Sequence, residues 1–524
     1  MMHMPAAWCT AIATLVVFVQ VSDGANILAI FPFHARSHTF VGTPLFLELA
    51  KRGHNVTMIS HHPQKEKIPN YTDIVLKASI LDIINNNGKP NNLFDQRDNN
   101  VVGIAFRMWN LNTMSCDAML QEEQIRKLIH STDIHFDLVV MEGFFNECFL
   151  GFVHKFKAPL IHFSTFGGTP WMGDWVGNPN PYAYVPDPFL AYSTKMNFWE
   201  RTVNTIVGTG WRLGRMFYYV PGQDKVMRKH FGHIEGLPSL SDIEYSTSLI
   251  FLNHHFSISY TRPLMPNIVQ VGGLHVKPPK ELPQDLKKYL DEATDGVIYF
   301  SMGSNLRSSQ MPDYKRDAFL KVFSELKQRV LWKWETDNLP GKSSNVKISQ
   351  WFPQSDILAH PNVRMFMTHG GLLSTQEALN RGVPLLGIPV FGDQTLNMAS
   401  AAAAGYGLML QFENITTESV RWAVREVLNN NRYRDNAQRL SRIYRDQPLT
   451  PMEQAVFWTE YVIRHKGARH MRSAALDLAW YQYFLLDVLA FLALVVTSVF
   501  VLLFVIAKQL CCRKKTDNLN KKRD

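Results

Sequence analysis

Short apolar runs alternate with helix-like stretches along most of the 524-residue chain. In the first such unit, the apolar run Asn26–Phe31 is followed by a helix-like stretch from Thr43 to Arg52. Gly53 ends that stretch, and the apolar run Val56–Ser60 follows. This order predicts a β-α-β unit with parallel strands. We expect later strands of the same sheet at residues 136–141 and 159–163.

The same alternation restarts at Gly296 after an irregular middle region. Residues 165–240 are rich in Pro, Gly and aromatic residues, and we expect loops and short helices there that wall a binding pocket. Residues 262–285 are rich in proline and charge without a period, which predicts an interdomain linker. The strands expected after Gly296 are 297–300, 330–334, 346–348, 363–367, 384–387 and 408–411. The pattern thus predicts an α/β protein with two doubly wound domains facing a cleft.

Both ends of the chain carry apolar segments that lie outside this alternation. The run Ala11–Val21 is followed by the small residues Ser22 and Gly24, which predicts a secretory signal peptide over residues 1–24. The alternative is a buried first strand. Residues 488–507 hold no charge and are long enough to cross a bilayer as a helix. Aromatic residues 480, 481 and 483 precede them, as at a membrane interface.

The distribution of charge predicts how the chain is oriented in the membrane. Of the formal net charge of +9, more than half lies in residues 508–524, which hold seven Lys and Arg against two Asp. We interpret this cluster as a cytosolic tail flanking the membrane, and we expect no nucleic-acid partner. The pair Lys521-Lys522 resembles a di-lysine retrieval signal, although a solvated basic tail is the alternative. These features together predict a single-pass type I membrane protein of the endoplasmic reticulum whose folded domains lie in the lumen.

Cysteines and glycosylation sequons are consistent with a lumenal body. Cys116 and Cys148 are the only cysteines between the two apolar ends, and they form either one disulfide or two free buried thiols. No zinc-type spacing of cysteine and histidine is present. Three Asn-x-Thr sequons begin at Asn55, Asn70 and Asn414.

Residues 366–394 concentrate the candidate chemistry. An apolar run leads to Thr-His369-Gly-Gly, a helix opens near Ser374, and a second apolar run leads to Asp393-Gln394. Every polar group falls in a loop or at a helix start, where an open parallel sheet holds a nucleotide. The segment resembles the signature of the UDP-glycosyltransferase family at His369, Glu377, Pro384, Pro389, Asp393 and Gln394. Leu373 stands where some relatives carry Asn.

The resemblance implies a GT-B fold, similar to the insect-like membrane-bound members of the family. It implies an acceptor-binding N-terminal domain over 25–261, the linker 262–285 and a UDP-sugar-binding domain over 286–450. Helices in 451–487 are then expected to return toward the N-terminal domain and the membrane, before the span 488–507 and the tail 508–524.

Histidines in the first β-α loop are candidates for a general base. His34 and His38 both follow the first strand, and histidine titrates near neutral pH. The resemblance assigns the role to the Ser37-His38 pair; the alternative is a histidine that caps the next helix. Glu142 follows the strand at 136–141 and is expected to orient the ring as in a hydrolase triad. Glu147 is the second candidate.

Donor contacts follow from strand-to-helix turns and from the resemblance. Two strand-to-helix turns, Gly303-Ser304 and His369-Gly371, offer backbone N–H groups to a diphosphate. Ser374, where the next helix opens, is expected to contribute to the same contact. The resemblance implies that Trp351 stacks on uracil while Gln354 reads its edge. It further implies that Lys333 reaches the phosphates, that Glu377 binds ribose, and that Asp393 and Gln394 hold the sugar.

The resulting hypothesis is an inverting glycosyltransferase that moves a hexose, glucose by preference, from a UDP-sugar to a hydroxyl of a small lipophilic acceptor, for conjugation or detoxification. UDP-glucuronate is the rival donor, and an inactive membrane-tethered binding protein is the rival class. No Asp-x-Asp pair is present, so we expect neither metal nor cofactor. The expected partners are donor, acceptor and membrane lipid, with a homo-oligomer left open.

Overall fold

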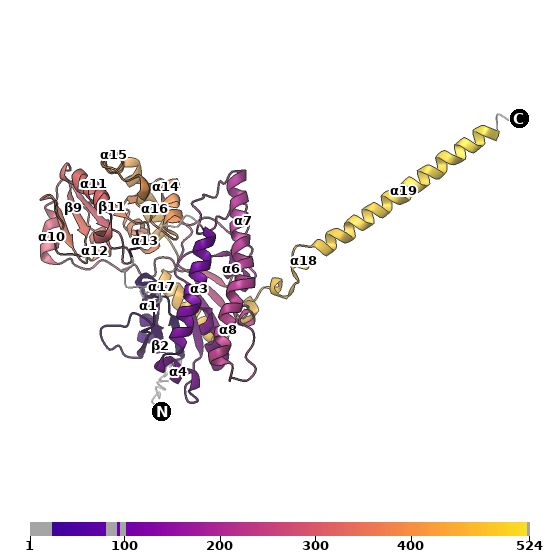
Figure 1. Cartoon of the computed structure of the whole chain (residues 1–524), viewed down its shortest axis with the longest axis horizontal. Coiled ribbons are helices and arrows are strands. Elements are labelled where there is room, and N and C mark those ends of the chain that lie inside the picture. The colour runs from indigo at the N-terminus through magenta and orange to yellow at the C-terminus, as the bar shows by residue number, and fades with distance from the viewer. Residues whose placement is uncertain (1–23, 80–91, 95–100, 521–524) are drawn as a thin grey trace, which may run out of the picture.

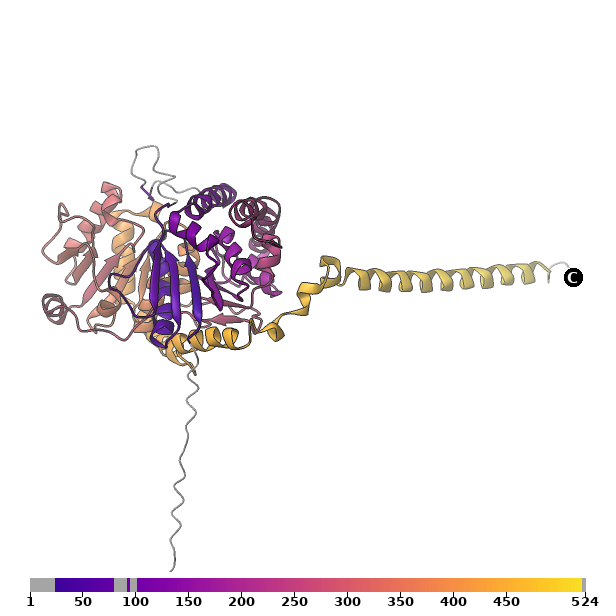
Figure 2. The same cartoon turned by 90° about the horizontal axis from the view of Figure 1, so that it is seen from below.

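The computed structural model describes residues 24–79, 92–94 and 101–520. The expected signal peptide, apart from Gly24, and the pair Lys521-Lys522 lie outside these residues. Two α/β lobes lie side by side, and a long C-terminal helix projects away from them (Figures 1 and 2).

The N-terminal lobe is built on a parallel sheet with the strand order β3-β2-β1-β4-β5-β6-β7. Its strands are β1 Asn26–Phe31, β2 Asn55–Ser60, β3 Tyr71–Val75, β4 Leu138–Glu142, β5 Leu160–Ser164, β6 Leu249–Leu252 and β7 Ile268–Gln270. The order reverses between β1 and β4, and the carboxyl ends of these neighbours open the crevice in which such sheets bind ligands.

Helices cover both faces of this sheet, which explains why its strands read as continuous apolar runs. Along β1, Ile27 and Ala29 face the apolar cluster that contains α1, whereas Leu28 and Ile30 face the cluster that contains α3. The helices of this lobe are α1 Arg36–Lys51, α3 Val101–Leu120, α4 Glu123–His130, α5 Gly151–Phe156, α6 Pro170–Val176, α7 Phe198–Gly214, α8 Val220–Phe231 and α9 Leu240–Glu244.

The expectation of only loops and short helices in 165–240 is wrong for residues 198–231. Helix α7, a π-helical turn at Arg215–Tyr219 and α8 follow one another without a break. The buried stripe of this long helix recurs every three or four residues and consists of Asn204, Gly208, Trp211, Arg215, Tyr219, Gln223, Met227 and Phe231. Half of these residues are polar or small, which weakens the apolar period by which a helix is recognised.

The expected linker 262–285 also needs correction. Strand β7 lies within it and pairs with β6 in parallel, so the N-terminal sheet continues to Gln270. Helix α10 (Gln284–Asp291) begins before the expected linker ends. A three-residue edge strand is too short to show a period, so nothing in the proline-rich sequence indicated it.

The C-terminal lobe contains a second parallel sheet with the order β10-β9-β8-β11-β12-β13. All six strands expected from the sequence are present: β8 Val297–Ser301, β9 Arg329–Lys333, β10 Val346–Ser349, β11 Val363–Thr368, β12 Leu385–Gly387 and β13 Gly407–Met409. Its helices are α10, α11 Asp313–Ser324, α12 Gln354–Leu358, α13 Leu372–Arg381, α14 Gln394–Ala403, α15 Thr417–Asn429 and α16 Asn431–Arg445.

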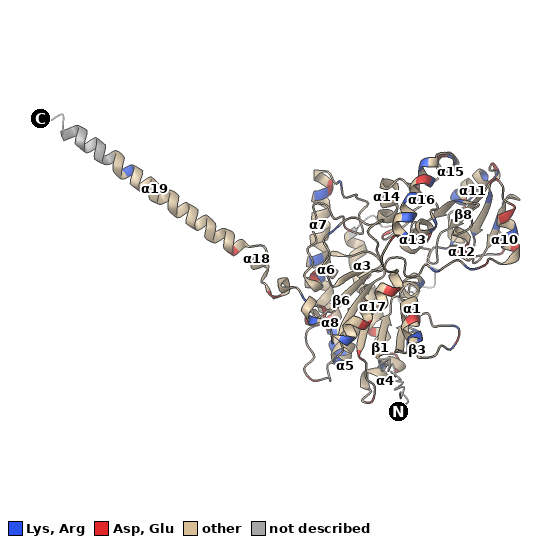
Figure 3. Cartoon of the chain, turned by 180° about the vertical axis from the view of Figure 1, so that it is seen from behind, with Lys and Arg blue, Asp and Glu red and all other residues tan. Residues whose placement is uncertain are grey.

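After α16 the chain crosses back to the first lobe. Ala455, Val456 and Val462 of α17 (Pro451–Arg464) join the apolar cluster formed by β1 and α1. Helix α19 (Leu486–Asn520) follows, and its part Leu486–Cys511 is long and apolar enough to cross a membrane. Most of α19 carries no charged residue (Figure 3). The expected span 488–507 lies within this helix.

The structure also settles the question about the cysteines. Cys116 on α3 and Cys148 in the 3-10 turn Glu147–Leu150 form a disulfide. The sequon residues Asn55, Asn70 and Asn414 are all exposed. Disulfides are typical of proteins that fold in an oxidising compartment.

Candidate active site

His38 and Glu142 meet at the carboxyl edge of the N-terminal sheet. His38 lies in the first turn of α1, which begins at Arg36 and therefore earlier than the sequence pattern indicates. Glu142 is the last residue of the neighbouring strand β4 and is fully buried. Its Oε1 is bonded to His38 Nδ1. A carboxylate on Nδ1 fixes the ring orientation and leaves Nε2, for which the described residues offer no hydrogen-bond partner, to face a substrate.

A third residue in this contact, Thr165, was not expected from the sequence. Its hydroxyl oxygen lies 3.0 Å from His38 Nδ1 and 3.3 Å from Glu142 Oε1. Thr165 directly follows β5, so it reaches the same sheet edge as Glu142 one strand away. The available signal was its position after an apolar run, since threonine itself is common in loops.

Aromatic rings line the space around His38. The ring centroids of Phe33, Phe144 and Phe166 lie 4.5, 5.2 and 6.2 Å from that of His38. The His38 side chain is 16% exposed, so the imidazole is shielded but accessible. These contacts make an apolar surrounding for any molecule that reaches Nε2.

The two alternative candidates lie elsewhere. The His34 ring packs against His61, with centroids 5.0 Å apart. Glu147 is buried and bonded to Arg215, with Oε1 2.9 Å from Nη1, and it also accepts a hydrogen bond from Tyr219. Glu147 therefore neutralises a buried guanidinium and does not contact the His38 ring.

On the C-terminal side, His369 is packed between two glycines. It follows β11, and a Cβ placed on either Gly303 or Gly371 would collide with its ring. Gly303 has a φ of +81°, which favours glycine for a second reason. Burial and the nearby Lys333 lower the pKa of His369 to about 4. The imidazole is therefore neutral near pH 7 and can donate a hydrogen bond without carrying charge.

Gln354, Ser374 and Glu377 form one hydrogen-bonded group. Gln354 begins α12, and its Nε2 donates to Glu377 Oε2 at 2.5 Å and to Ser374 Oγ at 3.0 Å. Glu377 lies one turn beyond Ser374 on α13. Burial raises the pKa of Glu377 to about 7. The structure thus brings together three residues that the sequence places in two separate segments.

Trp351 presents its ring between the two lobes. The residue is 56% exposed, which leaves part of the indole accessible to a planar ligand. The guanidinium of Arg36, from α1 of the other lobe, lies 5.6 Å from the Trp351 ring centroid, and Lys333 Nζ lies 6.0 Å from it. Lys333 is paired with Glu335 at 2.8 Å. Arg36 was not expected in the site, because only the fold places α1 beside the loop of Trp351.

Asp393 and Gln394 differ in their surroundings. Burial raises the pKa of Asp393, and the charge of His38 opposes that shift, which places these two residues within electrostatic range across the lobes. Asp393 Oδ2 accepts a hydrogen bond from Asn397 at 2.9 Å. The side-chain oxygen of Gln394 accepts from the N–H groups of Val390 and Phe391, at 2.8 and 3.1 Å. Gln394 therefore stabilises the loop and keeps only its NH2 group for a ligand.

The start of α13 is also where the two lobes are joined. Leu373 packs against the apolar cluster of the N-terminal sheet, and its carbonyl oxygen lies 3.1 Å from His275 Nε2. Gln376 Nε2 donates to the carbonyl oxygen of Asn253 at 3.1 Å. At position 373 the chain thus makes an apolar contact between the lobes. Ser304 is exposed in the loop that follows β8.

A family model described as "UDP-glucoronosyl and UDP-glucosyl transferase" matches residues 34–523 of the chain. The chain belongs to the UDP-glycosyltransferase family. It is 41% identical over 500 residues to "UDP-glycosyltransferase UGT5" of Dactylopius coccus, covering 94% of this chain and 93% of the relative. It is 40% identical over 491 residues to "UDP-glucosyltransferase 2" of the same organism, covering 92% of each.

The calicheamicin glycosyltransferase CalG4 is similar to this UDP-glycosyltransferase in fold, with a TM-score of 0.56 and 17% identity. The similarity covers 84% of this chain and 99% of that chain. The GT-B fold and the family expected from the sequence are thereby confirmed. This UDP-glycosyltransferase transfers a sugar from a UDP-sugar, and its C-terminal helix α19 fits a membrane span.

Proposed function

We propose that this UDP-glycosyltransferase transfers glucose, with inversion, to a hydroxyl of a small lipophilic acceptor, and that His38 is its general base. The proposal rests on the His38–Glu142 contact at the carboxyl edge of the N-terminal sheet, within electrostatic range of Asp393 in the C-terminal lobe. The acceptor hydroxyl gives its proton to His38 Nε2. Glu142 stabilises the imidazolium that forms, and Thr165 supports the same contact.

The proposed reaction is a single displacement. As the proton leaves, the acceptor oxygen forms a bond to the anomeric carbon of the sugar. The bond from that carbon to the UDP oxygen breaks on the opposite face, and the electron pair leaves with UDP. Backbone N–H groups near Gly303 and Gly371, together with neutral His369, are suited to stabilise the negative charge on the leaving diphosphate.

The remaining donor residues are assigned by their position around this diphosphate. Trp351 would stack on uracil, which its exposed ring permits, and Gln354 would read the edge of the base. Glu377 would accept hydrogen bonds from the ribose hydroxyls. Asp393, together with the NH2 group of Gln394, would hold sugar hydroxyls close to His38. Lys333 is the weakest assignment, because Glu335 already neutralises its charge.

Glucose is proposed because a relative named "UDP-glucosyltransferase 2" is 40% identical along nearly the whole chain. The family description also includes glucuronosyl transfer, so UDP-glucuronate is the competing donor. The aromatic rings of Phe33, Phe144 and Phe166 around His38 favour a lipophilic acceptor. Conjugation of endogenous or foreign compounds is the biological role that such an acceptor range would serve.

The proposed location is the membrane of the endoplasmic reticulum, with the two lobes in the lumen and α19 as the single span. The apolar N-terminal run and the terminal lysine pair of the sequence support this orientation. The disulfide between Cys116 and Cys148 fits an oxidising lumen. We further propose that transfer requires no metal ion, since helix N-termini and backbone N–H groups are suited to stabilise the negative charge of the diphosphate.

One assay tests these points together. Purified full-length enzyme is incubated with UDP-glucose, UDP-glucuronate or UDP-galactose and a panel of phenols and alcohols, with and without EDTA. We expect the fastest transfer from UDP-glucose to a phenol, unchanged by EDTA. Preferred use of UDP-glucuronate would replace the sugar assignment. Loss of turnover with EDTA would contradict the metal-independent step, and binding without turnover would favour an inactive binding protein.

A further inference from the structure

A separate cavity lies at the opposite edge of the N-terminal sheet from His38. Its volume is about 990 Å³, and it is lined by residues at which strands begin. Asp137 precedes β4, Pro159 precedes β5 and Ser248 precedes β6. Because the strands are parallel, their starting ends face away from the crevice at their carboxyl ends. The cavity is therefore distinct from the proposed catalytic site.

One wall of the cavity is the segment Lys466–Arg472, which we call the strap and which follows α17. At its start, Lys466, Gly467 and Ala468 have φ values of +46°, +95° and +46°. Non-glycine residues adopt this region only when their surroundings hold them there. Here Gly467 and Ala468 are buried, and Gly467 packs against Pro159 and Ser248. The strap is thus docked in a defined conformation against the sheet.

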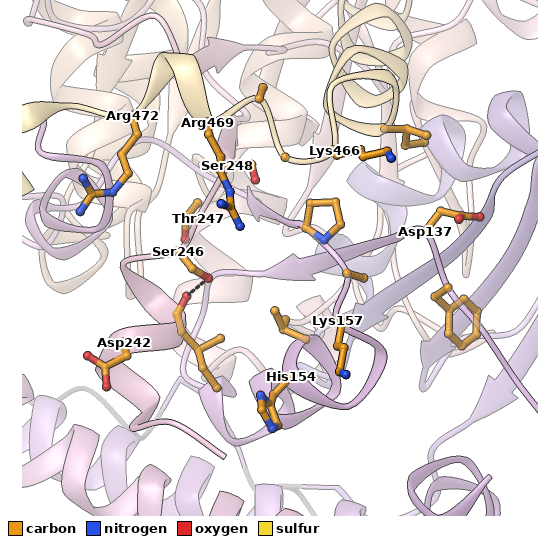
Figure 4. A pocket seen from close by; sticks show the side chains of 18 of the residues that line it. Asp137, His154, Lys157, Asp242, Ser246, Thr247, Ser248, Lys466, Arg469 and Arg472 are labelled. Atoms are coloured by element: carbon orange, nitrogen blue, oxygen red, sulfur yellow. Dashed lines mark hydrogen bonds between the residues drawn. The ribbon is translucent and has the colours of Figure 1, made fainter. Parts of the chain in front are cut away.

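Basic side chains reach the cavity from facing walls (Figure 4). Lys466, Arg469 and Arg472 come from the strap, and Lys157 comes from the end of α5. Lys157, Lys466 and Arg469 have no carboxylate within ion-pair distance among the residues that the structure describes. Arg472 is paired with Asp477 at 2.8 Å. Three exposed cations are therefore gathered without counter-charge around one cavity.

The two acidic residues of the lining are already engaged in holding the fold. Asp137 accepts a hydrogen bond from the Asn26 N–H at 2.8 Å and contacts His135 at 3.0 Å. Asp242 caps α9, with Oδ2 accepting from Ser239 Oγ at 2.6 Å. Neither carboxylate is paired with a Lys or Arg of the lining; within the lining, Asp137 is paired only with His135. The cavity is therefore suited to an anion.

The apolar part of the lining and the path of the chain toward α19 indicate which kind of molecule bears the anionic group. Phe136, Val153 and Ile463 add apolar surface to the same cavity. The strap continues through exposed Trp480 and Phe484 into α19, the candidate span. A ligand with a phosphate head and an apolar body, presented near a membrane, matches this combination of charge, apolar lining and position.

We propose that this cavity binds a phosphate monoester, with Arg469 and Lys157 as its principal ligands and phosphatidic acid, the glycerophospholipid whose head group is a phosphate monoester, as its source. Guanidinium and ammonium groups bind phosphate oxygens through charge-assisted hydrogen bonds. A soluble phosphate would satisfy the same cations, so the test separates the two sources. The proposal does not depend on the sugar, the acceptor or the catalytic base.

The test uses purified full-length protein in a neutral detergent and isothermal titration calorimetry. The probes are a short-chain phosphatidic acid, the matching phosphatidylcholine and inorganic phosphate. Wild-type protein is expected to bind phosphatidic acid saturably and phosphatidylcholine not at all. In K157Q/R469Q the Kd for phosphatidic acid should rise about tenfold or more. Arg464→Gln, a substitution on α17 outside the cavity lining, should leave it unchanged.

The outcomes discriminate clearly. Phosphatidic acid binding at least tenfold tighter than inorganic phosphate identifies the lipid as the source, and equal affinities identify a soluble phosphate. Equal binding by wild type and K157Q/R469Q, or no saturable binding of either phosphate probe, overturns the proposal. UDP titration of the same samples should give one unchanged Kd, which shows that the variant is folded and that the donor site is not the one affected.

Discussion

The two halves of the cleft build their sites in different ways. In the N-terminal half, His38, Glu142 and Thr165 come from three separate segments and contact one another at one sheet edge. In the C-terminal half, most of the proposed donor residues fall within two neighbouring segments, 351–354 and 369–394, and glycines bring the backbone close to His369. The proposed nucleotide site is thus built largely from neighbouring loops, whereas the proposed general base depends on packing between distant segments.

The first substitution, His38→Ala, tests the proposed base in the N-terminal half. If His38 is the base, turnover should fall by about 10²- to 10⁴-fold, because general bases contribute on that scale. UDP affinity measured by calorimetry should stay within about twofold, since the donor loops belong to the other lobe. His34→Ala serves as the matched control and should retain turnover. Full activity of His38→Ala would remove the base from the N-terminal half.

The second substitution, Glu142→Gln, keeps the size of the side chain and removes its charge. Turnover should fall by about 10²-fold, because the imidazolium formed during transfer loses its buried counter-charge. The Kd for UDP should stay within about twofold, because the donor loops belong to the other lobe. A loss of UDP affinity as large as the loss of turnover would show that Glu142 acts only through the fold.

The third substitution, Trp351→Ala, acts on the donor half alone. Loss of stacking should weaken uridine binding by about tenfold or more, while turnover at saturating donor changes little. Trp422 on α15 is similarly exposed, so Trp422→Ala is the matched control. An unchanged Kd for uridine in Trp351→Ala would show that the exposed indole does not hold the base.

The smallest effect concerns the ionisation of Glu377. Burial raises its pKa to about 7, so the carboxylate becomes the main form only above that pH. Because a carboxylate accepts hydrogen bonds from ribose more strongly than the neutral acid, uridine affinity should rise about threefold to tenfold between about pH 6 and about pH 8. Uridine avoids titration of the diphosphate itself. Glu377→Gln should abolish this dependence; a dependence that persists would assign it to another group.

The sequence was sufficient for those parts of the molecule that its local pattern specifies. The six strands of the C-terminal sheet and four of the seven N-terminal strands were expected from apolar runs, whereas β3, β6 and β7 were not. The family was expected from the resemblance of residues 366–394, and the His38–Glu142 contact from that resemblance and from the position of both residues after strands. The long helix from Phe198 to Phe231 was missed because its buried stripe contains Asn204 and Arg215. Arg36 and Thr165 were missed for another reason: each reaches the site only through packing between distant segments.

The lobes also differ in how they are held to the rest of the chain. The N-terminal lobe carries the disulfide and receives α17 and the strap, whereas Leu373 and Gln376 connect the donor loops to it. The chain that leads into α19 is thereby attached to the N-terminal lobe, and the proposed donor loops are positioned through α13. This arrangement explains how residues of both halves, such as His38 and Asp393, come within electrostatic range.

The central claim is a single displacement in which His38 from one half activates the acceptor against a donor held by the other. The most direct measurement is the anomeric configuration of the purified product, determined by proton NMR after transfer from UDP-glucose to a phenol. We expect a β-glucoside, since the donor bond is α and attack comes from the opposite face. An α-glucoside would contradict the single displacement and with it the role assigned to His38.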